Sequence, residues 1–148
     1  MNEQFKYFDG SLEEFLTFIK GMKENSLVKI KLMQSTALED LGIVNDSFYH
    51  VLDSFTVKHI YNKHSNEKEV LRGQLIIEES DFLLITDIIS NYDSRIIEKH
   101  DDGRILIVYT KSYPDCERYY VEAVRNGRHE LAGVTYYKRK RKLTGAKS

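Results

Sequence analysis

Cysteine is almost absent from this 148-residue sequence, and its scarcity excludes several kinds of site. The single cysteine, Cys116, has no second cysteine with which to form an internal disulfide. It also argues against a zinc site built from thiolates, since such a site needs several cysteines. Because disulfides are rare in reducing compartments, we expect a cytoplasmic protein.

Long hydrophobic runs are absent as well. No apolar stretch approaches the length of a transmembrane helix, and the first residues lack the pattern of a secretory signal peptide. There is no internal repeat and no low-complexity segment. Hydrophobic residues make up 41% and charged residues 30% of the chain, which is ordinary for a globular protein of one-domain size.

Charge is unevenly distributed, although the formal net charge is only −1. Six of the 22 basic residues lie at 138–142 and 147, which leaves 16 basic residues against all 23 acidic ones. The rest of the chain is therefore acidic and the C-terminal end is basic. Such an end either attracts polyanions or serves as a solubilising tail, and we expect residues 143–148 to be flexible.

The first 42 residues are predicted to form an appended β–α unit. The sequence "FKYFDG" is consistent with a short strand, and "LVKIKLM" alternates as a strand should. Between them, Ser11 and Glu14 form a capping-box pattern in front of apolar residues at helical spacing. "STALEDLG" predicts one or two helical turns that end at Gly42.

Residues 43–142 are predicted to form the main domain. "FYHVL" indicates a strand, after which Ser54 is expected to cap a helix that runs towards His64. "ESDFLLITDIISN" predicts a second amphipathic helix, and three strand-like runs follow. Helices followed by an antiparallel meander indicate an α+β fold, with helices packed on a sheet of four or five strands.

Asn126-Gly127 predicts a hairpin within the last strand-like run. A two-residue loop would pair Arg125 with Arg128, and this register divides the side chains between two faces. The expected core face holds Tyr119, Val121, Ala123, Ala132 and Val134. The expected exposed face holds Arg118, Tyr120, Glu122, Leu131, Gly133, Thr135 and Tyr137. A solvated face would also be polar, but cations and aromatic rings together suit RNA.

The segment "KHIYNKHSNEKEVLRGQ", residues 58–74, gathers ionisable nitrogen atoms. A zinc site would need His59 and His64 to converge, yet five helical positions place them roughly 140° apart unless the helix ends between them. A purely structural helix with polar decoration is the second interpretation. The third is an acid–base centre, because histidine transfers protons near neutral pH and Arg72 can bind a phosphate bidentately.

The order of "KHI…KH…E…RGQ", "SDFLLITDIIS", "ILIVYTK", "YYVEAV" and "GVTYYKRK" resembles phage-associated nucleases of the barnase–EndoU–colicin–RelE superfamily. The resemblance spans roughly residues 48–140. It implies a compact barnase/RelE-like α+β fold and a metal-independent endoribonuclease that needs no cofactor, often a toxin or an agent of phage–host conflict. The matched positions are His59, His64, Arg72, Gln74, Lys111 and Thr135.

For this nuclease interpretation we expect cleavage of RNA by its own 2′-OH, with catalytic His59, His64, Arg72, Lys111 and Thr135. Gln74, Arg118, Tyr120, Tyr137 and Lys138 are the expected substrate-binding residues. An acidic antitoxin or immunity protein is a possible partner of a toxin-like member. Two alternatives stay open: an RNA-binding module without catalysis, and an interaction protein that docks through residues 1–42.

Overall fold

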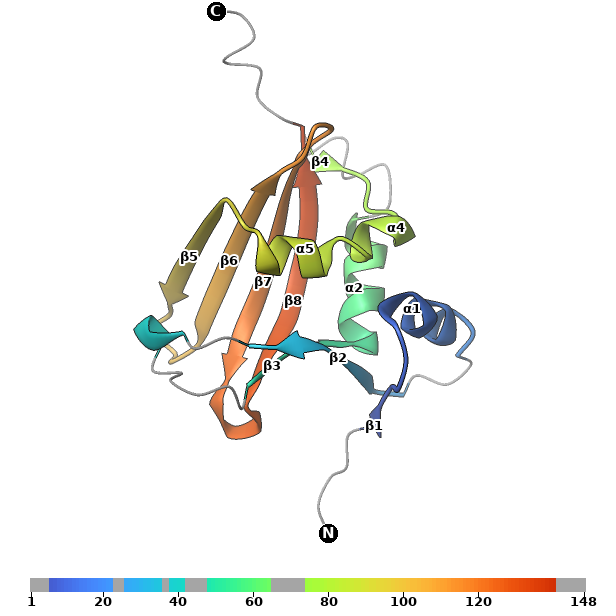
Figure 1. Cartoon of the computed structure of the whole chain (residues 1–148), viewed down its shortest axis with the longest axis horizontal. Helices are drawn as coiled ribbons and strands as arrows, with labels where there is room; N and C mark the ends of the chain where they lie inside the picture. Colours follow the sequence, from blue (N-terminus) through green and yellow to red (C-terminus); the bar gives the residue numbers. More distant parts are fainter. Residues whose placement is uncertain (1–5, 23–25, 36–37, 42–47, 65–73, 141–148) are drawn as a thin grey trace, which may run out of the picture.

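The computed structural model describes residues 6–22, 26–35, 38–41, 48–64 and 74–140 (Figure 1). His64, Arg72 and Gln74 belong to the predicted site, but Arg72 and the side chains of His64 and Gln74 lie outside the description. The basic residues after 140 and the predicted helix end at Gly42 lie outside it too.

The elements alternate in type along the first half of the chain, and strands dominate the second half. The strands are β1 (Lys6–Tyr7), β2 (Val28–Gln34), β3 (Tyr49–Asp53), β4 (Gln74–Leu75), β5 (Ser94–Lys99), β6 (Ile105–Ser112), β7 (Glu117–Arg125) and β8 (Glu130–Arg139). The helices are α1 (Leu12–Lys20), α2 (Ser54–His64), α4 (Glu79–Phe82) and α5 (Ile85–Ser90), with 3₁₀ turns at Glu39–Leu41 and Asn126–Arg128.

The strands within these described ranges form one sheet in the order β1-β2-β3-β8-β7-β6-β5, and β4 pairs with the end of β8. Most neighbours are antiparallel, but β1–β2 and β3–β8 are parallel. The predicted α+β class is therefore confirmed, whereas the predicted sheet of four or five strands was too small. The difference arises because β1 and β2 join the same sheet as the later strands and because β4, which was not predicted, pairs with the end of β8.

The N-terminal unit shares the core of the rest of the chain. Phe15, Leu16 and Ile19 of α1 are buried in one cluster with residues of α2, α5 and β6–β8. The capping box of α1 is present: Ser11 Oγ accepts a hydrogen bond from Glu14 N–H, and Glu14 Oε1 accepts one from Ser11 N–H. The helix thus begins where the sequence predicts it and packs against the common core.

Two local predictions for the helices need correction. The N-terminal cap of α2 is Asp53, whose Oδ1 accepts a hydrogen bond from Thr56 N–H at 2.7 Å. Ser54 Oγ instead accepts from Val28 N–H and donates to Ser26 O, which ties α2 to the start of β2. The predicted second helix is broken between Phe82 and Ile85 into α4 and α5, although its apolar face is buried as predicted.

The β7–β8 hairpin differs from prediction in its loop and in one bulge. Arg125 pairs with Glu130, because residues 126–129 form a longer connection in which His129 has a left-handed backbone (φ 54°). Further along, the register shifts at Val121/Glu122, where Val134 is the extra residue on β8. These shifts determine which side chains share a face.

Helices α4 and α5 lie over one face of the sheet, here called the helix face, and the opposite face is called the outer face. Helix α2 instead runs beside β8, along the stretch between the pairings of β8 with β3 and with β4 (Figure 1). Arg118 contacts α4 and Tyr120 lies in the core, so the alternate residues of β7 point to the helices. The predicted core face and exposed face were therefore interchanged for β7. Among the described residues, no helix has the length and apolar character needed to cross a membrane.

Candidate functional site

An aromatic and cationic cluster lies on the outer face, near the end of β8. Tyr119 and Tyr137 are directly opposed in the β7–β8 register, and their rings stack with centroids 4.9 Å apart and planes 8° apart. The guanidinium of Arg139 lies over both rings, 5.6 Å from the centroid of Tyr119 and 5.5 Å from that of Tyr137. These three residues are called the aromatic platform.

The platform is held in place and remains positively charged at its edge. Tyr119 donates its hydroxyl to Glu117 Oε1 at 2.9 Å, and burial together with this carboxylate raises the pKa of Tyr119. The hydroxyl therefore stays protonated at neutral pH. Arg139 is exposed, so its donors face solvent. Parallel rings beside a guanidinium can stack a nucleobase and bind an adjacent phosphate oxygen.

Thr135 lies on the same face as the platform. It pairs with Val121 and is two residues from Tyr137, so both side chains project from the outer face. The prediction placed Thr135 and Tyr137 on the same face as Arg118 and Tyr120. Because Val134 is bulged, they lie on the other face of the sheet. The hairpin prediction thus placed Thr135 on an outward-facing surface for the wrong reason.

Helix α2 runs alongside β8 near this position (Figure 1). β3 pairs with residues 130–132 of β8 and β4 pairs with residues 138–139, so Thr135 lies between these two partner strands. His59 is exposed on α2, and the helix continues through His64. The backbone of Gln74 pairs with Arg139. β4 therefore lies at the end of β8 that carries the platform.

Lys111 lies on the other side of the sheet. Its ammonium donates to Asn91 O at 2.9 Å, at the end of α5, and lies 5.7 Å from the ring centroid of Tyr113. Lys111 pairs with Arg118, which pairs with Lys138, so the helix face carries a row of three cations. The structure therefore does not bring Lys111 and Thr135 to one point.

Three of the predicted RNA contacts are buried beneath the helices. Arg118 and Lys138 both bind Asp81 of α4, with nitrogen–oxygen distances of 2.8 and 2.9 Å, and each residue is at most 8% exposed. Tyr120 is fully buried. The prediction of Arg118, Tyr120 and Lys138 as surface contacts was wrong, because ion pairing with Asp81 lets charged residues occupy the inner face.

Sequence reasoning missed Tyr119 and Arg139 as members of the site. Tyr119 was assigned to the core face because it alternates with Val121 and Ala123. Tyr119 on β7 lies across from Tyr137 on β8 only because of the bulge at Val134. The platform could therefore have been predicted only if the bulge had been known. A bulge of this kind has no local sequence signal apart from the glycine that precedes it.

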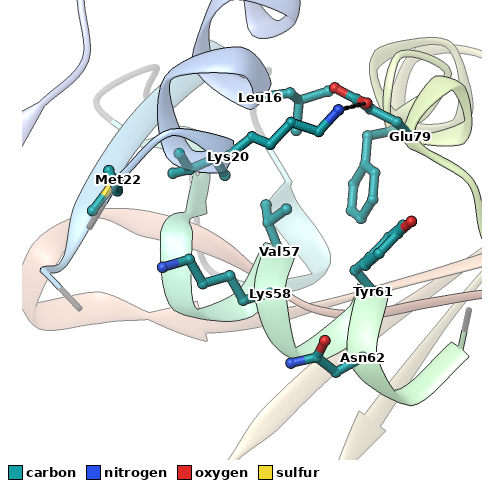
Figure 2. Close-up of a pocket in the computed structure, with 10 residues that line it drawn as sticks. Leu16, Lys20, Met22, Val57, Lys58, Tyr61, Asn62 and Glu79 are labelled. Atoms are coloured by element: carbon teal, nitrogen blue, oxygen red, sulfur yellow. Dashed lines mark hydrogen bonds and ion pairs between the residues drawn. The ribbon is translucent and has the colours of Figure 1, made fainter. Parts of the chain in front are cut away.

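In the described part of the chain, neither a metal-binding group nor the hollow beside α1 adds to this surface. Among the residues that the structure covers, no group of three or more His, Cys, Asp or Glu side chains lies close enough to hold a metal ion. A hollow of about 320 Å³ lies between α1 and α2, with Leu16 and Val57 in its wall and the Lys20–Glu79 ion pair (2.9 Å) at its rim (Figure 2). None of the predicted site residues lines it.

Comparison with known proteins gives one family. The model of the family described as phage-Barnase-EndoU-ColicinE5/D-RelE like nuclease3 matches residues 29–145, which include β3 to β8. Neither the curated proteins nor the solved structures that were compared give a match. The matched range contains the whole aromatic platform, Thr135 and both histidines of α2.

Proposed function

The chain belongs to the phage-Barnase-EndoU-ColicinE5/D-RelE like nuclease family, and from this we propose that it is an endoribonuclease acting on the outer face of β7 and β8. The observation that carries the choice of RNA is the stacked Tyr119–Tyr137 pair beneath Arg139. Aromatic faces bind unstacked bases of single strands, and a guanidinium binds phosphate, so together they fit single-stranded RNA.

Substrate binding would begin at the platform. A base stacks on the exposed side of the tyrosine pair, and Arg139 donates to a neighbouring phosphate. Base–aromatic stacking contributes about 1–3 kcal/mol per base, so this contact alone gives useful affinity. Thr135 would donate its hydroxyl to a phosphate oxygen further along the same face. The basic residues that follow Arg139 would add affinity that falls with salt.

Cleavage would use the 2′-OH of the substrate as nucleophile. His59 or His64 removes the 2′-OH proton, O2′ forms a bond to phosphorus, and the bond from phosphorus to O5′ breaks. The other histidine, or another acid, gives a proton to O5′, and each proton transfer typically contributes about 10²–10⁴-fold. Arg72 would stabilise the phosphoryl oxygens, and Gln74 would orient the turn. The products are a 2′,3′-cyclic phosphate and a 5′-hydroxyl.

The position of Lys111 changes the earlier expectation for it. A phosphate bound at Thr135 lies across the sheet from the Lys111 ammonium, which already donates to Asn91 O. We therefore leave Lys111 out of the phosphate contacts and assign Arg139 in its place. This assignment rests on strand register, because residues 111 and 118 share the helix face and residues 135, 137 and 139 share the outer face.

A toxin-like role in phage–host conflict would follow from the family. An inhibitor of such a nuclease would cover the outer face, where Arg139 is exposed, and we expect it to be acidic for that reason.

The test of this function has two steps. The purified chain is incubated with RNA in EDTA and the cut site is mapped, and then the same RNA is prepared with one 2′-deoxy nucleotide at that site. Loss of cleavage at the deoxy position, with a cyclic phosphate on the all-ribose product, would support the mechanism. Undiminished cleavage of the deoxy substrate would exclude it.

A binding module without catalysis is the alternative that the same platform supports. His59→Ala and His64→Ala separate the two functions, since neither residue belongs to the platform. Loss of cleavage with RNA affinity retained identifies an enzyme. Tight binding without cleavage by the unmodified chain identifies a binding module.

A further inference from the structure

A second cluster of aromatic rings and cations lies on the outer face, near the start of β8. The ammonium of Lys31 lies between two tyrosines, 4.9 Å from the ring centroid of Tyr7 and 4.5 Å from that of Tyr49. The three residues come from β1, β2 and β3. Lys31 is exposed and Tyr7 is 41% exposed, so the cation is positioned by the rings and still meets solvent. We call this the Lys31 cluster.

A buried ion pair lies beside this cluster on the same face. Lys29 Nζ lies 3.0 and 2.9 Å from the two carboxylate oxygens of Glu130, and both side chains are 3% exposed. Tyr7 donates its hydroxyl to Glu130 Oε2 at 2.8 Å, and burial together with this carboxylate raises the pKa of Tyr7 to about 12. Lys29 thus neutralises Glu130, and the exposed charge of the cluster is the cation of Lys31.

Strand register places the Lys31 cluster and the aromatic platform on the same face. Tyr49 pairs with Glu130, Lys31 pairs with Val51, and Val51 pairs with Ala132. Ala132 pairs with Ala123, which alternates with Val121 and Tyr119 on the outer face. Five residues of β8 and two strand spacings separate the clusters, a distance of roughly 20 Å.

We propose that the Lys31 cluster is a second RNA contact. Lys31 would bind a phosphate of the same RNA molecule that stacks one of its bases on the aromatic platform. The inference rests on the proposed function. The spacing fits a single-stranded site of about four or more nucleotides, a size common for such surfaces. Tyr7 lies before the family-matched residues 29–145, so the N-terminal strand of this chain completes the contact.

Phosphate is favoured as the ligand because of how Lys31 is held. Two rings restrict the side chain without consuming its hydrogen-bond donors, since a cation–π contact uses the charge and not an acceptor atom. An ordered ammonium that faces solvent binds a phosphate as a point charge with less loss of side-chain entropy. An acidic protein partner would use the same cation, and RNA binding that Lys31→Gln leaves unchanged would favour that partner and overturn the RNA contact.

The test compares two RNA lengths and two lysines. Lys31→Gln removes the proposed contact, and Lys99→Gln removes an exposed lysine from the edge strand β5 as a matched control. Binding of a long single-stranded RNA and of a short one that covers only the platform is measured against salt concentration. For the long RNA, Lys31→Gln should lower the slope of log affinity against log salt by about 0.7, the value for one phosphate contact.

For the short RNA, neither substitution should change binding. Lys31→Arg should retain the long-RNA affinity, and Tyr7→Phe should retain it because the ring stays in place. Equal effects of Lys31→Gln and Lys99→Gln, or equal effects on both RNA lengths, would overturn the inference while cleavage by the unmodified chain upholds the proposed function. An unmodified chain that neither binds nor cuts RNA would overturn both.

Discussion

At the scale of single residues, Asp81 determines how the charges of the helix face are arranged. Its carboxylate binds Arg118 from β7 and Lys138 from β8, and it also accepts a hydrogen bond from Glu78 N–H at 2.7 Å. All three charged residues are at most 8% exposed. One carboxylate therefore connects α4 to two strands, and it keeps two cations away from the outer face.

Asp81→Asn should destabilise the fold strongly, because it leaves two buried cations without their counter-ion. Breaking a buried ion pair by removing one partner typically costs about 3–5 kcal/mol. Urea unfolding of both proteins measures the change in the free energy of unfolding. Asp115→Asn is the matched control, since Asp115 also lies near Arg118, at 3.4 Å, but its side chain is 66% exposed. A loss as large for Asp115→Asn as for Asp81→Asn would contradict this explanation.

The Asp81 carboxylate should also make the free energy of unfolding depend on pH in the acid range. Burial on its own raises the pKa of Asp81, but hydrogen bonds from Lys138, Glu78 N–H and Arg118 together hold the pKa below the ordinary value of 3.8. Since the folded-state pKa is lowered, this contribution to stability is fully present above pH 3.8 and is lost as the pH falls below it. Asp81→Asn should lack that part of the acid-induced loss when both proteins are unfolded across this range.

At the scale of elements, the bulge at Val134 determines which of the later residues of β8 face the helices and which lie on the outer face. Gly133 and Tyr136 both meet the core although they are three positions apart, since Val134 is the extra residue between them. A Cβ on Gly133 would clash with the hydroxyl of Tyr120 and lie 3.0 Å from Leu52 Cδ1. The glycine therefore lets Tyr120 fill the core beneath β8.

Gly133→Ala should destabilise the chain by about 1–3 kcal/mol, the usual effect of overpacking a core. Tyr120→Phe alone should be neutral or slightly stabilising, because the buried hydroxyl has no hydrogen-bond partner among the residues described. The double variant should recover part of the loss, since the clashing oxygen is gone. Thermal or urea unfolding of all four proteins completes this cycle, and strictly additive effects would show that the clash is not the cause.

The elements also indicate how far sequence reasoning reaches. Local patterns predicted the Ser11–Glu14 capping box, the buried face of α4 and α5, and the strands, since each depends on residues close in the chain. The grouping of Tyr119 with Val121 on one face was also right. The burial of Arg118 and Lys138 involves ion pairs with Asp81, which is distant in sequence, and the positions of Thr135 and Tyr137 depend on the bulge. Neither could be derived from β7 and β8 alone.

At the scale of the whole molecule, the N-terminal unit is part of one sheet and one core. β2 pairs with β3, and Phe15 of α1 is fully buried in the common cluster. That residues 1–42 form an extension stays a prediction. Their packing nevertheless means that removing them would expose the core, so a deletion would not test docking by itself.

Phe15→Ala should therefore destabilise the entire chain by about 3–5 kcal/mol, as expected for a large buried side chain. Phe18→Ala, in the same helix but 39% exposed, is the control and should have a much smaller effect. Unfolding followed by a probe within β6–β8 tests the coupling. If Phe15→Ala lowered the unfolding midpoint reported by a probe in α1 but left the midpoint reported by the probe in β6–β8 unchanged, the N-terminal unit would fold independently.

The position of the RNA site is tested most directly by comparing two tyrosine–arginine pairs on opposite faces. Tyr137→Ala and Arg139→Ala alter the outer face, whereas Tyr92→Ala and Arg95→Ala alter a pair with similar geometry, 5.9 Å apart, at the β5 side of the helix face. The measurement is kcat/KM for one single-stranded RNA, on variants with unchanged melting temperatures. We expect a loss of roughly ten-fold or more for each outer-face variant, from stacking and phosphate contacts, and unchanged activity for the other pair. Full activity in the Tyr137 and Arg139 variants, with loss in the Tyr92 and Arg95 variants, would contradict the account.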